Sequence, residues 1–369
     1  MLYNMHYAYL CIDAIQTILD FSDIKMQLIL TSLSHECYDR LIIKKLKHWR
    51  LTQEILKQKK FSKLQILYAY ANGNITDVNH LKDTLIKLDC GFCCGIDQKG
   101  IAELSKLQML NANFNPKITD VNHLKNTLLE LNCGFCNSGS ECGIDQKGID
   151  GLLKLQKLCA YDNPNITNTN HLKNTLIALN CGGKCGIDQE GIAELLKLEK
   201  LDAYNKRKIS NVNHLKDTLT ELDCGGECHI DQEGIAELLK LQKLCLCDNR
   251  RITNVSHLKD TLIELECSGD CDIGQKEIAD LLNLQKLKAD NNPKITDVNH
   301  LKDTLVELEC RGKCGIDQKG ITGLLKIQRI TGLLKFQRLY ASKNSKITDV
   351  SRLEDPWICR PIYYCRIYY

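Results

Sequence analysis

The sequence lacks any uncharged apolar stretch of about 18 residues, the length that a membrane-spanning helix requires. Its N-terminus, MLYNMHYAYLCIDAIQTILDF, has no basic segment ahead of the apolar residues and carries Asp13 among them, unlike a secretion signal. The net charge is only +3, and acidic and basic residues are interleaved, so no polybasic surface for nucleic acid is indicated. We therefore expect neither a membrane nor a nucleic acid among the partners.

Catalytic motifs are also absent from the sequence. It contains no nucleophile placed beside a base, no phosphate-binding glycine loop and no HExxH zinc motif. The sequence therefore predicts a protein that is not an enzyme and that needs no cofactor.

Cysteine, in contrast, is abundant, with 21 residues in 369. Disulfide frameworks are typical of small secreted domains, whereas this chain is long and shows no secretion signal. Reduced thiols and an intracellular location, in cytoplasm or nucleus, are the prediction.

A fixed period organises most of the chain. The stretch 284–326 holds two leucine-patterned segments of 21 and 22 residues, and near-copies of this pair recur at intervals of mostly 43 residues. Two intervals are longer, because residues 137–141 are inserted and ITGLLKIQR at 321–329 is repeated as ITGLLKFQR at 330–338. A period of this length predicts a solenoid, in which each repeat packs only against its neighbours.

The first segment type reads L-x-x-L-x-A-x-x-N-x-x-I-T, and the second reads L-x-x-L-x-C followed by Cys-Gly-Ile and usually Asp-Gln-x-Gly-Ile. Both resemble leucine-rich repeats, and the Ile-Thr-Asp signature of the first type resembles the cysteine-containing class. The resemblance covers about 64–350 and implies an α/β fold with a parallel concave sheet and short helical or irregular convex arcs. Thirteen segments begin at Leu64, Leu85, Leu107, Leu128, Leu155, Leu176, Leu198, Leu219, Leu241, Leu262, Leu284, Leu305 and Phe336.

Within each segment, the alternation predicts a short strand. The fourth and sixth residues point inward, and the third, fifth and seventh point outward. Each coil buries only part of its apolar surface by itself, so that neighbouring coils must stack as parallel strands with right-handed connections.

An asparagine occupies the ninth position of most first-type segments. We expect its amide to turn inward and to satisfy backbone groups of successive coils. Lys206 interrupts this column, and because a buried lysine is not an amide, we expect its coil to be the weakest. The column comprises Asn72, Asn115, Asn163, Asn249, Asn292 and Asn344.

Paired cysteines recur in the second segment type. A ladder of zinc sites is one interpretation, because thiolates are usual structural zinc ligands. The favoured interpretation is packing, since the first cysteine of each pair falls on an inward strand position; disulfides are a further alternative. The pairs are Cys90/Cys94, Cys133/Cys142, Cys181/Cys185, Cys224/Cys228, Cys267/Cys271 and Cys310/Cys314.

Six histidines share an Asn/Ser-His-Leu context on the predicted convex arc. Successive members lie two coils, or about 10 Å, apart. This spacing favours a repeated structural role over a metal or pH device. The histidines are His80, His123, His171, His214, His257 and His300.

Opposite charges alternate on the outward strand positions toward the C-terminal half. Basic pairs such as Lys286/Lys288 lie beside acidic pairs such as Glu307/Glu309, a pattern that favours neutralisation between strands. Aromatic side chains, which often anchor interfaces, lie mostly nearer the N-terminal half. We therefore predict that Tyr68, Tyr70, Tyr161 and Tyr204 bind a protein partner on the concave face.

The N-terminal segment 10–41 has apolar residues at helical spacing, interrupted by Ser22-Asp23, which predicts two or three short helices. It resembles an F-box, in which an apolar I-x-x-I-L step, an Asp-containing turn, a leucine helix and a closing aromatic follow one another. That resemblance implies docking on the Skp-type adaptor of a cullin-RING ubiquitin ligase. An ordinary helical cap over the first repeat is the alternative. The implied adaptor-binding residues are Leu10, Ile15, Ile18, Leu19, Phe21, Ile24, Leu28 and Leu33.

The predicted organisation is therefore an F-box-like domain (1–45), a helical linker or cap (46–63), the solenoid (64–350) and a C-terminal cap or tail (351–369). The function implied is that of a non-catalytic substrate-recognition subunit of an SCF-type ligase, monomeric outside its complex. A free-standing interaction scaffold is the alternative, and metal storage or sensing through the cysteines is a third possibility. The near-identical repeats also resemble expanded repeat families of large amoeba-infecting DNA viruses, which would imply a host-cell location.

Overall fold

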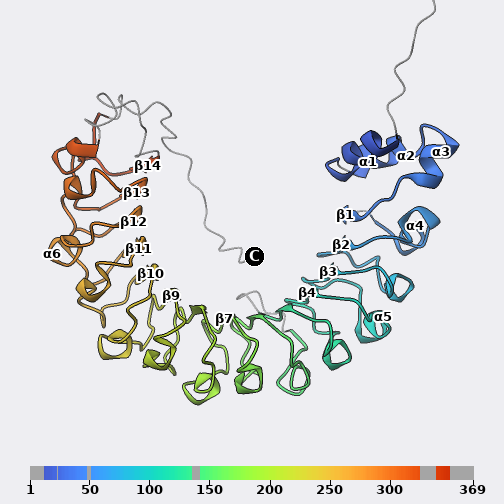
Figure 1. Ribbon diagram of the computed structural model, residues 1–369, viewed down its shortest axis with the longest axis horizontal. Helices are drawn as coiled ribbons and strands as arrows, with labels where there is room; N and C mark the ends of the chain where they lie inside the picture. Colours follow the sequence, from blue (N-terminus) through green and yellow to red (C-terminus); the bar gives the residue numbers. More distant parts are fainter. Residues whose placement is uncertain (1–11, 23, 48–50, 135–141, 325–337, 350–369) are drawn as a thin grey trace, which may run out of the picture. The chain divides into compact units, whose positions relative to one another are not determined.

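The computed structural model describes residues 12–22, 24–47, 51–134, 142–324 and 338–349 (Figure 1). The chain forms two compact units, residues 1–167 and 168–369. The predicted tail 351–369, Leu10 and most of the duplicated 330–338 segment lie outside the described residues.

The first unit begins with three short helices and continues as stacked coils. Its strands pair in parallel and in chain order, from β1 to β6. The helices are α1 (Ile12–Asp20), α2 (Ile24–Thr31), α3 (His35–Arg40), α4 (Gln53–Leu56) and α5 (Gln98–Ile101), with 3-10 turns η1 (Lys59–Phe61), η2 (Asn79–Leu81) and η3 (Asn122–Leu124). The strands are β1 (Lys45–Lys47), β2 (Ile66–Tyr68), β3 (Lys87–Asp89), β4 (Met109–Asn111), β5 (Glu130–Asn132) and β6 (Lys157–Cys159).

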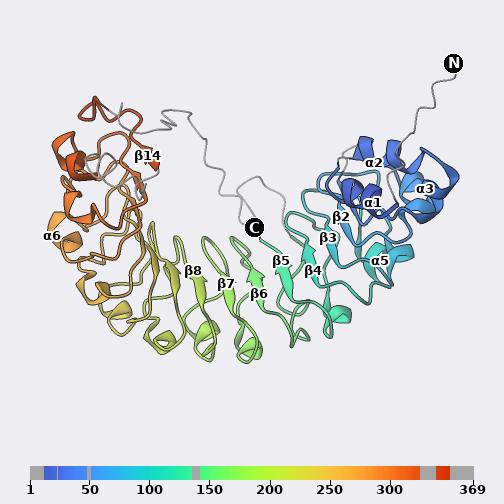
Figure 2. The ribbon, with the colours of Figure 1, turned by 45° about the horizontal axis from the view of Figure 1, so that its top comes forward.

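The second unit has the same construction. Its strands pair in parallel and in chain order, from β7 to β14, and in each unit the strands line one side and the short helical turns the other (Figures 1 and 2). The strands are β7 (Ala178–Asn180), β8 (Lys200–Asp202), β9 (Glu221–Asp223), β10 (Lys243–Cys245), β11 (Glu264–Glu266), β12 (Lys286–Lys288), β13 (Glu307–Glu309) and β14 (Arg338–Tyr340). The turns are η4 (Asn170–Leu172), η5 (Glu190–Ile192), η6 (Asn213–Leu215), η7 (Glu233–Ile235), η8 (Ser256–Leu258), α6 (Gln275–Ile278), η9 (Asn299–Leu301) and η10 (Lys319–Ile321).

These observations confirm the predicted leucine-rich-repeat solenoid in each unit. Every one of the thirteen expected strands forms at its expected place, from β2 to β14. The fourth and sixth positions point inward as predicted: Leu67 and Ala69 are almost completely buried, and leucine faces leucine in every pair of neighbouring strands, as Leu244 faces Leu265. The core of each unit therefore lies between the strands and the helical turns.

One boundary differs from the prediction, because the sheet begins before residue 64. Strand β1 pairs in register with β2, and Leu46 opposes Leu67. Leu46 and Phe61 are buried as in the later coils, and the predicted boundary at residue 45 falls within β1. Helical residues occur in the predicted segment 46–63, as α4 and η1. A single leucine between two lysines is too short an alternation to predict a strand without its neighbour.

The recurring Asp-Gln-x-Gly sequence has a structural cause in each coil. Asp97 caps the turn that follows it, accepting a hydrogen bond from Gly100 N at 2.9 Å. Gln98 reaches the next coil, where its Nε2 donates to the carbonyl of Asp120 and its Oε1 accepts from Asp120 N. Gly100 lies so close to the preceding coil that a Cβ would meet Thr76 O at 2.2 Å, so coil spacing as well as the corner requires glycine there.

The asparagine column links successive coils as predicted. The Nδ2 atom of Asn115 donates to the carbonyls of Cys90 and Ile96 at 2.9 and 3.0 Å, and its Oδ1 accepts from Lys117 N. Between Asn163 and Asn249 in the sequence, Lys206 occupies the position that asparagine has in the other coils, and its side chain is buried, with 2% exposure. Its Nζ donates a hydrogen bond to the carbonyl of Cys185. The lysine therefore replaces part of the hydrogen bonding that asparagine provides in the other coils, although the sequence predicted that it would not.

Candidate functional site

The candidate site is the strand face, which we define as the surface formed by the outward strand residues and the residues directly after each strand. It is the face predicted above to be concave. In the second unit, this face is neutralised by ion pairs between neighbouring strands, as the sequence predicted. Glu221 forms ion pairs with lysines of both neighbouring strands: its Oε1 lies 2.9 Å from Lys200 Nζ and 3.3 Å from Lys243 Nζ. Further pairs are Lys286–Glu264, Lys288–Glu266, Lys288–Glu309, Arg311–Glu309, Arg311–Asp290 and Arg338–Glu307.

The first unit carries a different surface around Tyr68. The ammonium groups of Lys45, Lys47 and Lys87, on the two strands that flank β2, lie 5.6, 5.8 and 5.6 Å from the centre of the Tyr68 ring. Asp89 lies close by. Burial raises its pKa, and a hydrogen bond from Gly91 N and the charges of Lys87 and Lys47 oppose that rise. Within the described residues, none of these three lysines forms an ion pair.

An aromatic cluster continues this surface past the strand ends. The Tyr70 ring stacks on Phe92 with centres 5.5 Å apart, and Phe92 meets Phe114 edge-on at 5.7 Å. Tyr70 is 49% exposed and Phe92 43%, whereas Phe114 is buried. We call Lys45, Lys47, Tyr68, Tyr70, Lys87 and Phe92 the Tyr68 patch.

The four predicted partner-binding tyrosines do not form one group. Tyr68 and Tyr70 lie on the same coil, in the Tyr68 patch. Tyr161 follows β6 beside the backbone of Gly134, and Tyr204 follows β8 in the second unit, against Gly225 and Gly226. Sequence reasoning missed the three lysines and Phe92, because their neighbours come from coils about 20 residues away in the sequence.

The predicted adaptor-binding residues lie on α1 and α2 and the turns beside them. Leu19 is fully buried, Ile15 is partly buried, and Ile18, Phe21 and Leu33 are exposed by 45%, 90% and 60%. Ile24 and Leu28 lie on α2. The predicted short helices of this segment are present as α1, α2 and α3, whereas adaptor binding remains a prediction.

The paired cysteines pack inside the coils. The first member of every pair is fully buried, in agreement with the packing interpretation. Burial raises the pKa of Cys142 and Cys228 to about 11, so these thiols are protonated near neutral pH. In the Cys267/Cys271 pair, a hydrogen bond from Cys267 lowers the pKa of Cys271.

The histidine column also faces protein rather than an open site. His123 Nε2 lies 3.1 Å from the carbonyl of Ile101, and His214 and His300 make the same contact with Ile192 and Ile278. Burial lowers the pKa of His80, His123, His214 and His257. This arrangement supports the structural role predicted for the column.

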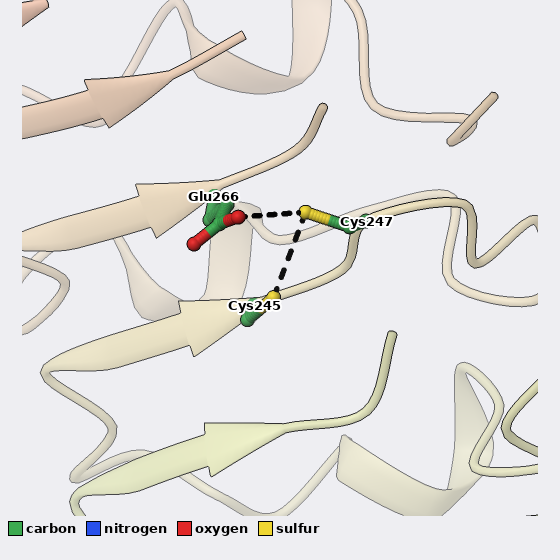
Figure 3. A group of neighbouring side chains, drawn as sticks. All are labelled: Cys245, Cys247 and Glu266. Carbon is green, nitrogen blue, oxygen red and sulfur yellow. Dashed lines mark hydrogen bonds between the residues drawn. The ribbon is translucent and has the colours of Figure 1, made fainter. Parts of the chain in front are cut away.

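One group of metal-ligating side chains lies on the strand face of the second unit (Figure 3). The ligand atoms of Cys245, Cys247 and Glu266 all lie within 4.8 Å of one another, and all three residues are partly exposed. They are the one such group among the residues that the structure describes. The sequence signal was a Cys-x-Cys at outward positions, where the other coils lack a second thiol.

No protein-family model and no curated protein matches the chain. Among solved structures, an internalin from Listeria monocytogenes is 18% identical, covers 92% of this chain and 90% of its own, and gives a TM-score of 0.43. The functional domain of InlJ from Listeria monocytogenes, described as including a cysteine ladder, is 18% identical over 76% of this chain and 70% of its own, with a TM-score of 0.45. A leucine-rich-repeat protein from Leptospira interrogans is 18% identical over 89% and 98%, with a TM-score of 0.40.

In the described part of the chain, every helix is too short or too polar to cross a membrane.

Proposed function

We propose that the chain is a protein-binding repeat scaffold and that the Tyr68 patch of the first unit binds an acidic segment of a protein partner. The observation that carries this proposal is the placement of three lysines around one tyrosine ring without an ion-paired carboxylate of their own. A partner's carboxylates would supply ion-pair partners for these lysines.

The neighbouring aromatics support the proposal through a second kind of contact. Tyr70 and Phe92 present apolar ring faces beside the lysines and are only partly covered. Aromatic residues are frequent anchors of protein interfaces, because a rigid ring buries a large area with little loss of side-chain entropy. An acidic segment with an apolar side chain beside its carboxylates therefore fits this patch.

The second unit offers a weaker case for such a partner. There the lysines of the strand face already contact glutamates of the adjacent strands, as Lys200 and Lys243 contact Glu221. An acidic segment would have to displace these intramolecular contacts before it gained its own.

The experiment begins with co-purification and identification of a bound protein, followed by titration of that purified partner with the full chain. Lys45→Glu/Lys47→Glu and Tyr68→Ala should each weaken binding at least 10-fold, and the wild-type affinity should fall as salt rises. Lys157→Glu is the matched control, because Lys157 is a strand-face lysine already paired with Glu130 at 2.6 Å. Equal affinities for the wild type and for both Tyr68-patch variants would overturn the proposal.

A finer proposal concerns α1 and α2. Exposed apolar side chains gather there, with Phe21 at 90% and Leu33 at 60% exposure, as an F-box-like docking surface for an Skp-type adaptor would require. With an adaptor on the helices and a target on the strand face, the chain would act as the substrate-recognition subunit of a ubiquitin ligase. A scaffold without a ligase link is the alternative.

Full-length variants test this finer proposal without deleting β1. Phe21→Asp/Leu33→Asp should abolish capture of a purified Skp-type adaptor. Leu196→Asp, at a leucine that is 62% exposed in the second unit, should not. If the wild type itself fails to bind the adaptor, the scaffold alternative holds.

A further inference from the structure

We propose that Cys245, Cys247 and Glu266 form a binding site for a thiophilic divalent cation of the zinc type on the strand face of the second unit. The site is separate from the Tyr68 patch and from the buried cysteine pairs. The evidence for it is the set of ligand side chains, the spacing of their ligand atoms and the register of β10 and β11.

The spacing suits a tetrahedral ion. The sulfur atoms of Cys245 and Cys247 lie 3.7 Å apart. An ion about 2.3 Å from two sulfurs at the tetrahedral angle holds them about 3.8 Å apart. The Cys247 sulfur lies 3.0 Å from Glu266 Oε1, and a zinc ion would separate such a pair to about 3.5 Å, which a small rotation of the glutamate provides.

The backbone holds these ligands in place. Cys245 ends β10 and lies directly opposite Glu266 of β11 in the parallel register, while Cys247 follows two residues later on the same side (Figure 3). Two adjacent coils therefore supply all three ligands, Cys245 and Glu266 from paired strands and Cys247 from just after β10, which limits how far they can separate. On the other side of β10, Asp223 of β9 lies opposite Cys245, and its Oδ1 accepts a hydrogen bond from Gly225 N at 3.0 Å.

Binding of the ion would release protons from the two thiols, because cysteine binds a metal as thiolate. The ion would form bonds to two sulfurs and one carboxylate oxygen, and the two thiol protons would pass to solvent. Lys288 Nζ lies 3.3 Å from Glu266 Oε2, so the second carboxylate oxygen is held by the lysine while Oε1 faces the thiols. Three protein ligands leave a fourth position for water.

The site is specific to this coil. Equivalent fifth and seventh positions carry Cys159 and Tyr161 in the first unit, and Asp202 and Tyr204 in the second. The core cysteine pairs of the two flanking coils, Cys224/Cys228 and Cys267/Cys271, are at most 1% exposed and are therefore out of reach of an ion at the surface. Cys247 replaces the residue found at the seventh position of the other coils, so this coil has two outward thiols instead of one.

Cobalt(II) is the probe, because its bonds to thiolate give a charge-transfer absorption band. The reduced full chain, freed of metal by a chelator, should take up one equivalent of Co²⁺ with this band, and one equivalent of Zn²⁺ should displace it. Cys247→Tyr should lose the band while keeping the fold, since tyrosine occupies that position in three other coils, as Tyr70, Tyr161 and Tyr204. Glu266→Gln should raise the dissociation constant at least 10-fold, and the control Cys159→Ser should match the wild type.

Two results would overturn the inference. One is the absence of a thiolate–cobalt band in the reduced wild type. The other is an undiminished band in Cys247→Tyr, which would assign the metal to other cysteines. Because the readout is metal binding, it is independent of whether any protein partner binds the Tyr68 patch.

Discussion

Lys206 donates a hydrogen bond from its buried ammonium group to the backbone carbonyl of Cys185, one coil earlier in the second unit. In the asparagine coils, one amide both donates to the preceding coil and accepts from its own backbone, as Asn249 does with Cys224 O and Arg251 N. A lysine can only donate, and its charge is costly to bury.

Lys206→Asn should therefore stabilise the protein, by about 1–2 kcal/mol. The new amide would reach the carbonyls of Cys181 and Ile187 and accept from Lys208 N, by analogy with Asn249. Denaturant unfolding followed by circular dichroism measures the effect. The reciprocal change, Asn292→Lys, should destabilise, and a lower midpoint for Lys206→Asn would contradict this reasoning.

Gly234→Ala should destabilise the second unit by about 1–3 kcal/mol, since a Cβ there would meet Ser210 O at 2.2 Å and force two coils apart. Gly73→Ala is the control, because no atom lies within 4 Å of its added Cβ. Thermal melts of the two variants give the comparison. Equal losses would mean that coil spacing is not what requires glycine at position 234.

Mild acid should destabilise the protein through its histidines. An unfolded imidazole takes up a proton below about pH 6.5, whereas burial lowers the pKa of His80, His123, His214 and His257 in the folded chain. Between the two pKa values the unfolded state binds more protons, so the free energy of unfolding falls as pH falls below about 6.5. Denaturant midpoints from pH 7.5 to 5.5 should show this fall, and His123→Gln/His214→Gln should reduce it. An unchanged slope in the double variant would argue against the assignment.

Charge neutralisation on the strand face should contribute far less to stability than the leucines beneath it. Glu221→Gln should cost less than about 1 kcal/mol, because its pairs with Lys200 and Lys243 are partly exposed. The adjacent Leu222→Ala should cost about 2–5 kcal/mol, because Leu222 is 2% exposed inside the core. Urea unfolding of both variants tests the ranking, and a reversed order would show that electrostatics hold the strands together.

Much of the fold was predictable because repetition amplifies a weak local signal. A three-residue strand such as β8 is too short to recognise by itself, but the same alternation at thirteen places with a fixed spacing leaves little ambiguity. Strand β1 was missed because Lys45–Lys47 departs from the repeat. Its place in the sheet depends on the contact between Leu46 and Leu67, which joins residues 21 apart.

The candidate site was less predictable than the fold. Tyr68 and Tyr70 could be chosen as exposed aromatics from their outward positions, but the three lysines around Tyr68 come from β1 and β3, about 20 residues away on either side in the sequence. The same holds for the thiol pair, since Glu266 joins Cys245 and Cys247 only through the register of β10 and β11.

The sequence by itself determined the period, the inward and outward sides of each strand and the columns of asparagine, histidine and cysteine, because these features recur at fixed spacing in one dimension. The tertiary structure decided which departures from the repeat lie together. Lys206 meets Cys185, and Cys247 meets Glu266, across coils about 20 residues apart. A repeat pattern specifies what each coil has in common with the others, whereas the chemistry of an exception depends on its neighbours in the stack.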